Sequence, residues 1–291
     1  MSIASIQDFT PEHRRKLVLA KRVAAIAMAV SGRLSSSKLL VVLLSLNALC
    51  RAQSPLPDTI PEIVTDRPDV TESSIVVPKA SLQLENGATY TSVRGSQTFD
   101  LTESLIRLGL TANTELRLVV PNYLGGIAGQ NPTGFGDIAV GMKEQLGPLP
   151  GGVDLSVIVA ISLPTGAAQV SSHGYDPFIK FPWSKELRAG WSVGGMQSVF
   201  WNTDDHRSNG DWEPTFYVEK EITKPWDAFV EYAGDFSERG GPREIAHLGT
   251  AYRITARQQV DFHFGFGVSK AAPSRFFAVG YSFRIDKIWG R

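Results

Sequence analysis

Large apolar residues alternate with small or polar residues along the C-terminal end of the chain, over residues 258–269 and again over 275–285. In the first stretch valine and phenylalanine occupy every second position, whereas Asp261, His263 and small residues stand between them. Successive side chains of a β-strand point to opposite faces, so the pattern predicts strands with one large apolar face and one small or polar face. Because glycine and serine fill a protein core poorly but suit a wet lumen, the pattern favours a transmembrane β-barrel with lipid outside.

The chain from residue 81 onward consists of segments of this kind. Their lengths suit a tilted crossing of a bilayer, which needs about 9–11 residues, and no apolar stretch is long enough for a membrane-spanning helix. We therefore predict an all-β protein, an antiparallel transmembrane β-barrel of about 12 strands over residues 81–291. The predicted strands lie near residues 81–92, 98–110, 113–121, 135–146, 152–163, 175–185, 188–201, 211–222, 226–237, 244–255, 257–269 and 275–285.

Many connections between the predicted strands alternate between short and long. Residues 111–112 and 223–225 are tight turns, whereas residues 122–134 and 202–210 form long connections. Outer-membrane barrels have short turns on the periplasmic side, longer loops outside and an even number of strands. The alternation therefore predicts a barrel of the bacterial outer membrane with both ends of the barrel in the periplasm.

The N-terminal segment has the features of a processed leader. Residues 39–49 form an apolar run, basic residues precede it, and Ala52 offers a small residue for cleavage, so we predict a signal peptide ending at residue 52. Residues 1–52 are then an N-terminal extension and signal peptide, and a true start at Met28 would give a signal of ordinary length. The alternative is that residues 10–30 form a basic amphipathic helix at a membrane surface. Residues 53–80, which are rich in proline, are predicted to be an extended periplasmic leader.

Charge and cysteine content narrow the function. Of the 29 basic and 29 acidic residues, eight and two lie in residues 1–52, so the rest of the chain carries six more negative than positive charges. An acidic body argues against nucleic acid as a partner, since nucleic-acid binding relies on clustered Lys and Arg. The single cysteine, Cys50, falls within the predicted signal peptide, which leaves no thiol for a disulfide, a metal site or a nucleophile.

Three patterns could carry chemistry. Residues 190–194 match G-x-S-x-G, but that motif needs a strand-to-helix elbow and these residues lie inside a predicted strand. Residues 204–206, Asp-Asp-His, lie in a long loop without a spaced partner, and we interpret them as solvated rather than metal-binding. His247 and His263 lie on predicted inner faces and favour a hydrogen-bond network in the lumen. We predict no catalytic residue, metal or cofactor, and a protein that is not an enzyme.

Charged residues just before the first strand suggest a role for the leader. A barrel of about twelve strands has a narrow lumen, and the leader could fold into it so that its charges pair with inward-facing residues. A plain periplasmic tail is the alternative. The candidate lumen or plug residues are Asp66, Arg67, Asp69, Glu103, Arg107, Arg117, Arg253, Asp261 and His263.

Several short motifs resemble one family of outer-membrane barrels, the family named for the MetA pathway of phenol degradation. The similar pieces are TDRPD at 65–69, RLGLT at 107–111, GFGD at 134–137 and SLPTG at 162–166, and the similarity extends roughly over residues 62–285. The resemblance implies a transporter-like barrel that passes or binds small hydrophobic or aromatic compounds. One departure is the end of the chain, since such barrels commonly end on an aromatic residue, whereas here DKIWGR follows the last strand.

We therefore expect an outer-membrane channel or transporter that gives passive passage to small hydrophobic or aromatic solutes, with selectivity set by lumen and loop side chains. The expected partners are membrane lipid and lipopolysaccharide, a small hydrophobic solute and the outer-membrane assembly machinery. The alternatives are a lipid-acting barrel enzyme, a structural or adhesive surface barrel, and a soluble β-sandwich.

Overall fold

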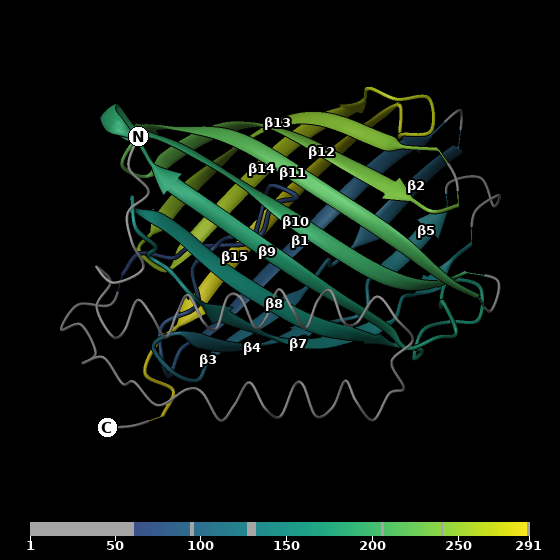
Figure 1. The fold of residues 1–291 in the computed structure, drawn as a ribbon, viewed down its shortest axis with the longest axis horizontal. Helices are drawn as coiled ribbons and strands as arrows, with labels where there is room; N and C mark the ends of the chain where they lie inside the picture. Colours follow the sequence, from purple (N-terminus) through teal and green to yellow (C-terminus); the bar gives the residue numbers. More distant parts are fainter. Residues whose placement is uncertain (1–60, 94–95, 127–131, 205–206, 240, 290–291) are drawn as a thin grey trace, which may run out of the picture.

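The computed structural model describes residues 61–93, 96–126, 132–204, 207–239 and 241–289 (Figure 1). The predicted extension and signal peptide, residues 1–52, lie outside these residues. In the described part of the chain, no helix is both long and apolar enough to cross a membrane.

Twelve strands wind into a closed antiparallel barrel, as the alternation of apolar and polar residues predicts (Figure 1). Sequential strands pair with each other around the wall, and the last strand pairs with the first, so that no open edge remains between them. The strands are β1 (Leu82–Val93), β3 (Leu105–Gly109), β4 (Thr114–Val119), β7 (Ile138–Gln145), β8 (Val153–Leu163), β9 (Asp176–Glu186), β10 (Trp191–Asp204), β11 (Arg207–Thr223), β12 (Trp226–Ser237), β13 (Arg243–Thr255), β14 (Gln258–Gly267) and β15 (Arg275–Ile285).

Three short strands, β2 (Ser96–Leu101), β5 (Tyr123–Gly126) and β6 (Gly134–Phe135), continue the second, third and fourth positions of the wall. The first half of β1 pairs with β3 and its second half with β2, while β5 pairs with both β2 and β6. The sequence predicts unbroken strands here, and that detail is wrong. Thr102 adopts a positive φ of 62° and Pro121 has no backbone N–H, so neither residue fits a regular ladder.

The two ends of the barrel differ in the length of their connections. Only Lys224 and Pro225 join β11 to β12, whereas residues 164–175 join β8 to β9 at the opposite end. The start of β1 and the end of β15 lie at the end with the short turns. By the rule for outer-membrane barrels, we call this the periplasmic end and the opposite end the outer end.

The two faces of the wall have the predicted character. On β14, the outward Phe262 and Phe266 are 44% and 43% exposed, whereas the inward Asp261 and His263 are 6% and 9% exposed. The most buried large side chains include Arg107 and Lys143, so the interior is polar and charged. An apolar surface outside and a polar interior are what a barrel in lipid requires.

The C-terminal tail fastens the seam between the last and first strands. The Asp286 carboxylate accepts hydrogen bonds from Arg284 Nε at 2.7 Å and from the Ser81 hydroxyl at 3.0 Å. The N–H of Ile288 donates to the Ala80 carbonyl at 2.8 Å. The residues after β15 therefore hold the chain just before β1 at the periplasmic end.

Candidate functional site

Residues 61–81, which we call the inner segment, form a loop inside the barrel without helix or strand (Figure 1). The sequence predicts an extended periplasmic leader over residues 53–80, and the described part of it, residues 61–80, lies instead in the lumen. The N–H of Ile63 donates to the Ala256 carbonyl at the β13–β14 turn, at 2.9 Å. The returning half meets the opposite wall through three pairs: the hydroxyls of Ser74 and Ser184 at 2.7 Å, Val76 N–H and Gln145 at 3.2 Å, and Val77 N–H and Glu115 at 2.7 Å.

Three cations from neighbouring strands gather beneath this loop. The ladder register places Arg107 of β3 beside Arg117 of β4, and Glu115 of β4 beside Lys143 of β7. The three cationic side chains are 0%, 6% and 0% exposed. Cations this close and this buried repel one another unless carboxylates lie between them. Glu115 supplies one such carboxylate, at 2.9 Å from Arg107 and 2.8 Å from Arg117.

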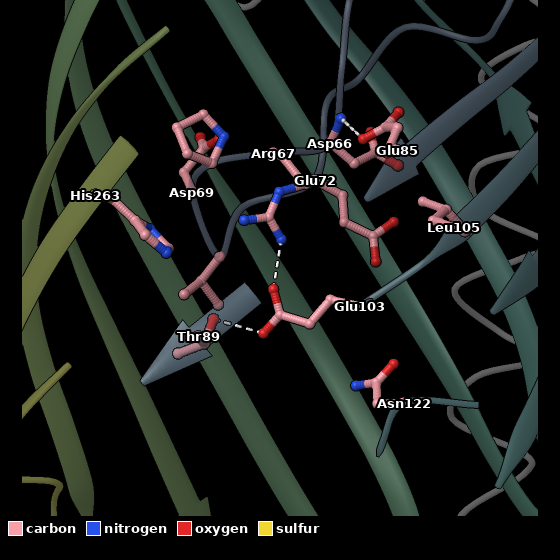
Figure 2. A pocket seen from close by; sticks show the side chains of 12 residues that line it. Asp66, Arg67, Asp69, Glu72, Glu85, Thr89, Glu103, Leu105, Asn122 and His263 are labelled. Atoms are coloured by element: carbon pink, nitrogen blue, oxygen red, sulfur yellow. Dashed lines mark hydrogen bonds and ion pairs between the residues drawn. The ribbon is translucent and has the colours of Figure 1, made fainter. Parts of the chain in front are cut away.

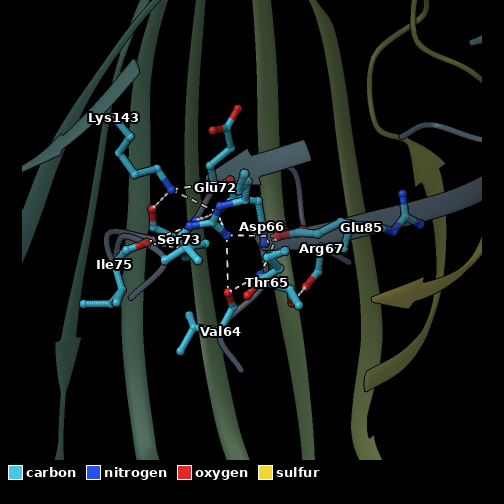
Figure 3. A network of polar contacts seen from close by, with 12 residues as sticks. Val64, Thr65, Asp66, Arg67, Glu72, Ser73, Ile75, Glu85 and Lys143 are labelled. Carbon is cyan, nitrogen blue, oxygen red and sulfur yellow. Dashed lines mark hydrogen bonds and ion pairs between the residues drawn. The ribbon is translucent and has the colours of Figure 1, made fainter. Parts of the chain in front are cut away.

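Asp66 of the inner segment contacts all three cations, and Figure 3 shows it beside Lys143. Its carboxylate oxygens lie 3.1 Å from Arg107, 2.6 Å from Arg117 and 3.1 Å from Lys143. Its backbone N–H donates to the Glu85 carboxylate of β1 at 2.8 Å. One aspartate thus links the inner segment to β1, β3, β4 and β7.

Further contacts continue this network along the inner segment. The Glu72 carboxylate bridges Arg117 and Lys180 of β9, at 2.6 Å to each. The wall cations also donate to backbone carbonyls of the segment. Arg107 donates to Ile75 and Lys143 to Ser73, both at 2.8 Å. Charged side chains of the wall therefore satisfy backbone groups that a segment without secondary structure would otherwise leave unpaired.

Arg67 lies against the seam between β1 and β15. Its guanidinium is 2.6 Å from Glu103 (Figure 2) and 3.4 Å from Asp261. Gly87 and Gly280 face each other across the seam. A Cβ on Gly87 would lie 2.2 Å from Arg67 Nη1, and one on Gly280 would lie 2.5 Å from Arg67 Nε. The two glycines therefore make the flat space in which the guanidinium lies.

Glu231 of β12 holds the far side of the loop. Its carboxylate accepts from the N–H groups of Val70 and Thr71 at 2.8 and 2.9 Å, and from the Thr71 hydroxyl at 2.5 Å. His247 Nε2 lies 2.5 Å from the same carboxylate. The inner segment is thus fixed on opposite walls of the lumen, by the cation cluster on one side and by Glu231 on the other.

Aromatic side chains also face the lumen. Phe178 of β9 and Phe200 of β10 are register partners whose ring centroids lie 5.2 Å apart, and Lys180 Nζ lies 5.4 Å from both. On another part of the wall, the Phe276 ring lies 5.8 Å from the His247 ring and 5.6 Å from the His263 ring. The lumen therefore combines charged groups with two aromatic surfaces.

A pocket of about 340 Å³ lies against the tip of the inner segment (Figure 2). Glu103, Asn122 and Thr89, from the outer part of the wall, form one side of it. This volume lies in the range of small-molecule sites. The complete lining consists of Asp66, Arg67, Pro68, Asp69, Val70, Glu72, Glu85, Thr89, Glu103, Leu105, Asn122 and His263.

Most of the residues predicted for the lumen meet around the inner segment. Asp69 and His263 line the pocket, and Asp69 forms no ion pair with any cation in the described ranges. Arg253 lies apart, at the periplasmic end, where it contacts Asp227 at 2.6 Å and Glu62 at 3.3 Å. The residues brought together in ion pairs are Asp66, Arg67, Glu103, Arg107, Arg117 and Asp261.

The sequence reasoning missed several partners in this network. Lys143 and Lys180 each stand at an inward position of a predicted strand, and the alternation alone could have marked them as lumen residues. Glu72 and Glu231 are different, because their roles depend on where the inner segment crosses the lumen. Nothing in the local pattern of residues indicates that crossing.

The other candidate motifs do not form a site in the described residues. Ser192, in the G-x-S-x-G match, lies near the start of β10 and donates to Glu219 at 3.3 Å, with a strand rather than a helix following it. Of the Asp-Asp-His run, residues 205 and 206 lie outside the described residues. Across the described ranges, no group of three or more His, Cys, Asp or Glu is placed to hold a metal ion.

Two of the family-like motifs meet at the outer end of the wall. Asp137 of GFGD accepts hydrogen bonds from the N–H of Gly166, in SLPTG, at 2.8 Å and from the N–H of Ser172 at 3.0 Å. A Cβ on Gly166 would lie 2.8 Å from the Phe135 carbonyl oxygen. Partial burial would raise the pKa of Asp137, but these N–H groups outweigh it and hold the pKa below its ordinary value. The two motifs thus fasten residues 164–175 to the end of β6.

A closed antiparallel barrel with an apolar exterior, a polar lumen and unequal ends has the fold of outer-membrane channels. The chain belongs to the family described as "Putative MetA-pathway of phenol degradation", whose model matches residues 65–285. None of the curated proteins compared with the chain matches it.

Solved structures agree on the fold. An outer membrane channel from Pseudomonas putida F1 superimposes with a TM-score of 0.57 at 10% identity, covering 80% of this chain and 100% of that one. The NanC porin superimposes with a TM-score of 0.52 at 10% identity, covering 70% of this chain and 100% of its own. At such low identity these likenesses concern the architecture alone.

Proposed function

We propose that the protein is a channel of the bacterial outer membrane that gives small solutes passive passage, with the inner segment setting the width of the path. The observation that carries this proposal is the closed barrel with a polar, charged interior and a pocket in it. A wall of this kind encloses water and excludes lipid. Export by the predicted signal peptide, lipid and lipopolysaccharide outside the barrel, and insertion by the outer-membrane assembly machinery belong to the same proposal.

The solutes that we propose are small hydrophobic or aromatic compounds. The family description refers to phenol degradation. The paired rings of Phe178 and Phe200 offer an aromatic solute a surface for stacking inside the lumen. Pro68, Val70 and Leu105 give the pocket an apolar part. Selectivity would then come from the side chains of the lumen rather than from a reaction.

Conductance in planar lipid bilayers tests the proposal. The protein, purified from outer membranes in detergent, is expected to give discrete current steps, and phenol is expected to interrupt them in proportion to its concentration. Phe178→Ala with Phe200→Ala should reduce the interruptions and leave the steps in place. Outward-facing Phe262→Ala serves as the control. Absence of current above that of protein-free bilayers would contradict a channel, whereas steps that phenol does not interrupt would contradict the aromatic solute alone.

The role of the inner segment can be tested in the same bilayers. Asp66→Ala combined with Arg67→Ala removes two of the groups that tie the tip of the segment to the wall. We expect larger or noisier current steps, because the segment would no longer hold a fixed position across the lumen. Unchanged conductance together with unchanged heat stability would show that the segment does not set the width of the path.

A further inference from the structure

The pocket at the tip of the inner segment has the chemistry of a cation site. Its lining contains five carboxylates and a single cation, Arg67. Three of the five, Asp66, Glu72 and Glu85, are already paired with wall cations. Glu103 is paired with Arg67, which leaves the Asp69 carboxylate without a cation among the described residues. The carboxyl group of Asp69 is therefore the one in this lining that no described cation pairs with.

The chain itself shows that this wall accepts an organic cation. The Arg67 guanidinium occupies a flat space over Gly87 and Gly280 and contacts Glu103 and Asp261. Charge-assisted hydrogen bonds from a planar cation to carboxylates are among the stronger polar contacts in proteins. This bound guanidinium is an observation independent of the number of carboxylates, and it fixes the kind of group that the wall recognises.

Two buried acceptors beside Arg67 are left unused. Within the described ranges, Asp261 Oδ2 has no hydrogen-bond partner, and the Asp261 side chain is 0% exposed. His263, which lines the pocket and is nine-tenths buried, has no partner at Nδ1 (Figure 2). In the neutral imidazole that carries its proton on Nε2, Nδ1 is an acceptor. Buried acceptors without partners are costly unless a donor reaches them.

The wall cations cannot attract an anion to this place. The side chains of Arg107 and Lys143 are fully buried, and that of Arg117 is 6% exposed, beneath the inner segment. Each of these three cations contacts at least one carboxylate. A solute that enters from the outer end therefore meets carboxylates at the pocket, and the pocket also offers the apolar surfaces of Pro68, Val70 and Leu105.

We propose that this pocket binds a small organic cation, an ammonium or guanidinium group on an apolar body, with Asp69 and Glu103 as the recognising carboxylates. The inference deepens the proposed function, on which it rests, by naming the charge of the preferred solute. It makes the channel selective for cations, because carboxylates along a path favour the passage of positive charge.

Three probes that share one ring and differ in charge test the proposal. Binding of benzylammonium, benzoate and benzyl alcohol is measured by isothermal titration calorimetry on the full protein in detergent, with protein-free detergent as the blank. We expect benzylammonium to bind at least about tenfold more tightly than the other two, the effect of one charge-assisted contact. Asp69→Asn is expected to remove about tenfold of this affinity. Glu244→Gln, which removes a charge from the outward side of β13, should change nothing.

Several results would overturn the proposal. Benzoate or benzyl alcohol binding as tightly as benzylammonium would contradict cation recognition, as would the absence of benzylammonium binding. Affinity that survives both Asp69→Asn and Glu103→Gln would place the cation elsewhere. Calorimetry measures binding whether or not the barrel conducts. Benzylammonium binding without current would contradict the channel alone, whereas current without benzylammonium binding would contradict the cation site alone.

Selectivity in bilayers is the second readout. Under a KCl gradient, the reversal potential of the wild-type channel is expected to show preference for K⁺ over Cl⁻. Asp69→Asn should lower this preference by about threefold, since one charge acts through a partly screened lumen. Preference for Cl⁻, or a ratio that Asp69→Asn leaves unchanged, would contradict the inference while leaving the channel itself established.

Discussion

Single glycines allow the inner segment to lie directly on the barrel wall. A Cβ on Gly109 would lie 2.1 Å from the Pro78 carbonyl oxygen and 2.4 Å from that of Val77. These are backbone atoms, which cannot rotate away as the end of a long side chain can. The return path of the segment over β3 therefore depends on one residue without a side chain.

Gly109→Ala is expected to push the inner segment off β3. The free energy of unfolding should fall by about 1–3 kcal/mol, the usual cost of overpacking a tight contact. The measurement is the temperature at which the compact gel band converts to the unfolded band. Gly125→Ala is the matched control, because a Cβ there meets only the Tyr123 ring at 3.4 Å. Equal conversion temperatures for the two variants would show that the contact is loose.

Asp66 and Asp69 are a second matched pair, only three residues apart. Asp66→Asn removes one of the two carboxylates that the three buried cations share and should destabilise the barrel by about 3–5 kcal/mol. Asp69→Asn breaks no ion pair with a described cation and should cost much less. Urea unfolding followed by tryptophan fluorescence compares the two. A similar loss for both variants would mean that the Asp66 contacts are not what stabilises this region.

At the scale of elements, one carboxylate, that of Asp137, makes several of the contacts that hold the outer loop over residues 164–175. The pKa of Asp137 is lowered from an ordinary value of 3.8, because hydrogen bonds from backbone N–H groups outweigh its partial burial. A carboxylate whose pKa is depressed in the folded protein stabilises it above the unfolded pKa and loses this contribution as pH falls through the folded pKa. The contribution of Asp137 is therefore present above pH 3.8 and is lost as the pH falls from 3.8 through the lower pKa of the folded protein.

Pepsin, which is active in this range, can report the change. Cleavage within residues 164–175 should rise as pH falls below 3.8, after correction for cleavage of an unstructured peptide. Asp137→Asn should be cleaved at the higher rate at every pH, since it cannot ionise. If wild type and variant follow the same curve, the hydrogen bonds to Gly166 and Ser172 do not hold the loop.

The alternation of side chains was enough to predict which face of β14 meets lipid. Asp261 and His263 were placed in the lumen because phenylalanines flank them at every second position. The interruption at Thr102 could not be predicted, since threonine ordinarily favours a strand and nothing in the local sequence indicates its positive φ of 62°. The contacts of Glu231 with Val70 and Thr71 join residues that are 161 and 160 positions apart in the sequence. Local pattern contains no information about such contacts.

At the scale of the whole molecule, closure of the wall makes a direct prediction. A closed barrel resists detergent at room temperature, because its ladder hydrogen bonds form a continuous ring. Protein extracted from outer membranes should run as a compact, faster band on a gel before boiling and as a slower band after it. A single unshifted band, with protein in the soluble periplasmic fraction, would contradict a membrane barrel.

The place where Arg67 lies has a consequence for the order of assembly. Its flat space consists of Gly87 from the first strand and Gly280 from the last, and these two meet only when β15 pairs with β1. Asp261 also comes from a late strand, β14. A nascent barrel that still lacks its last strands therefore has no complete seat for Arg67, although this residue precedes every strand of the wall. The complete seat of the guanidinium therefore exists only in the closed ring.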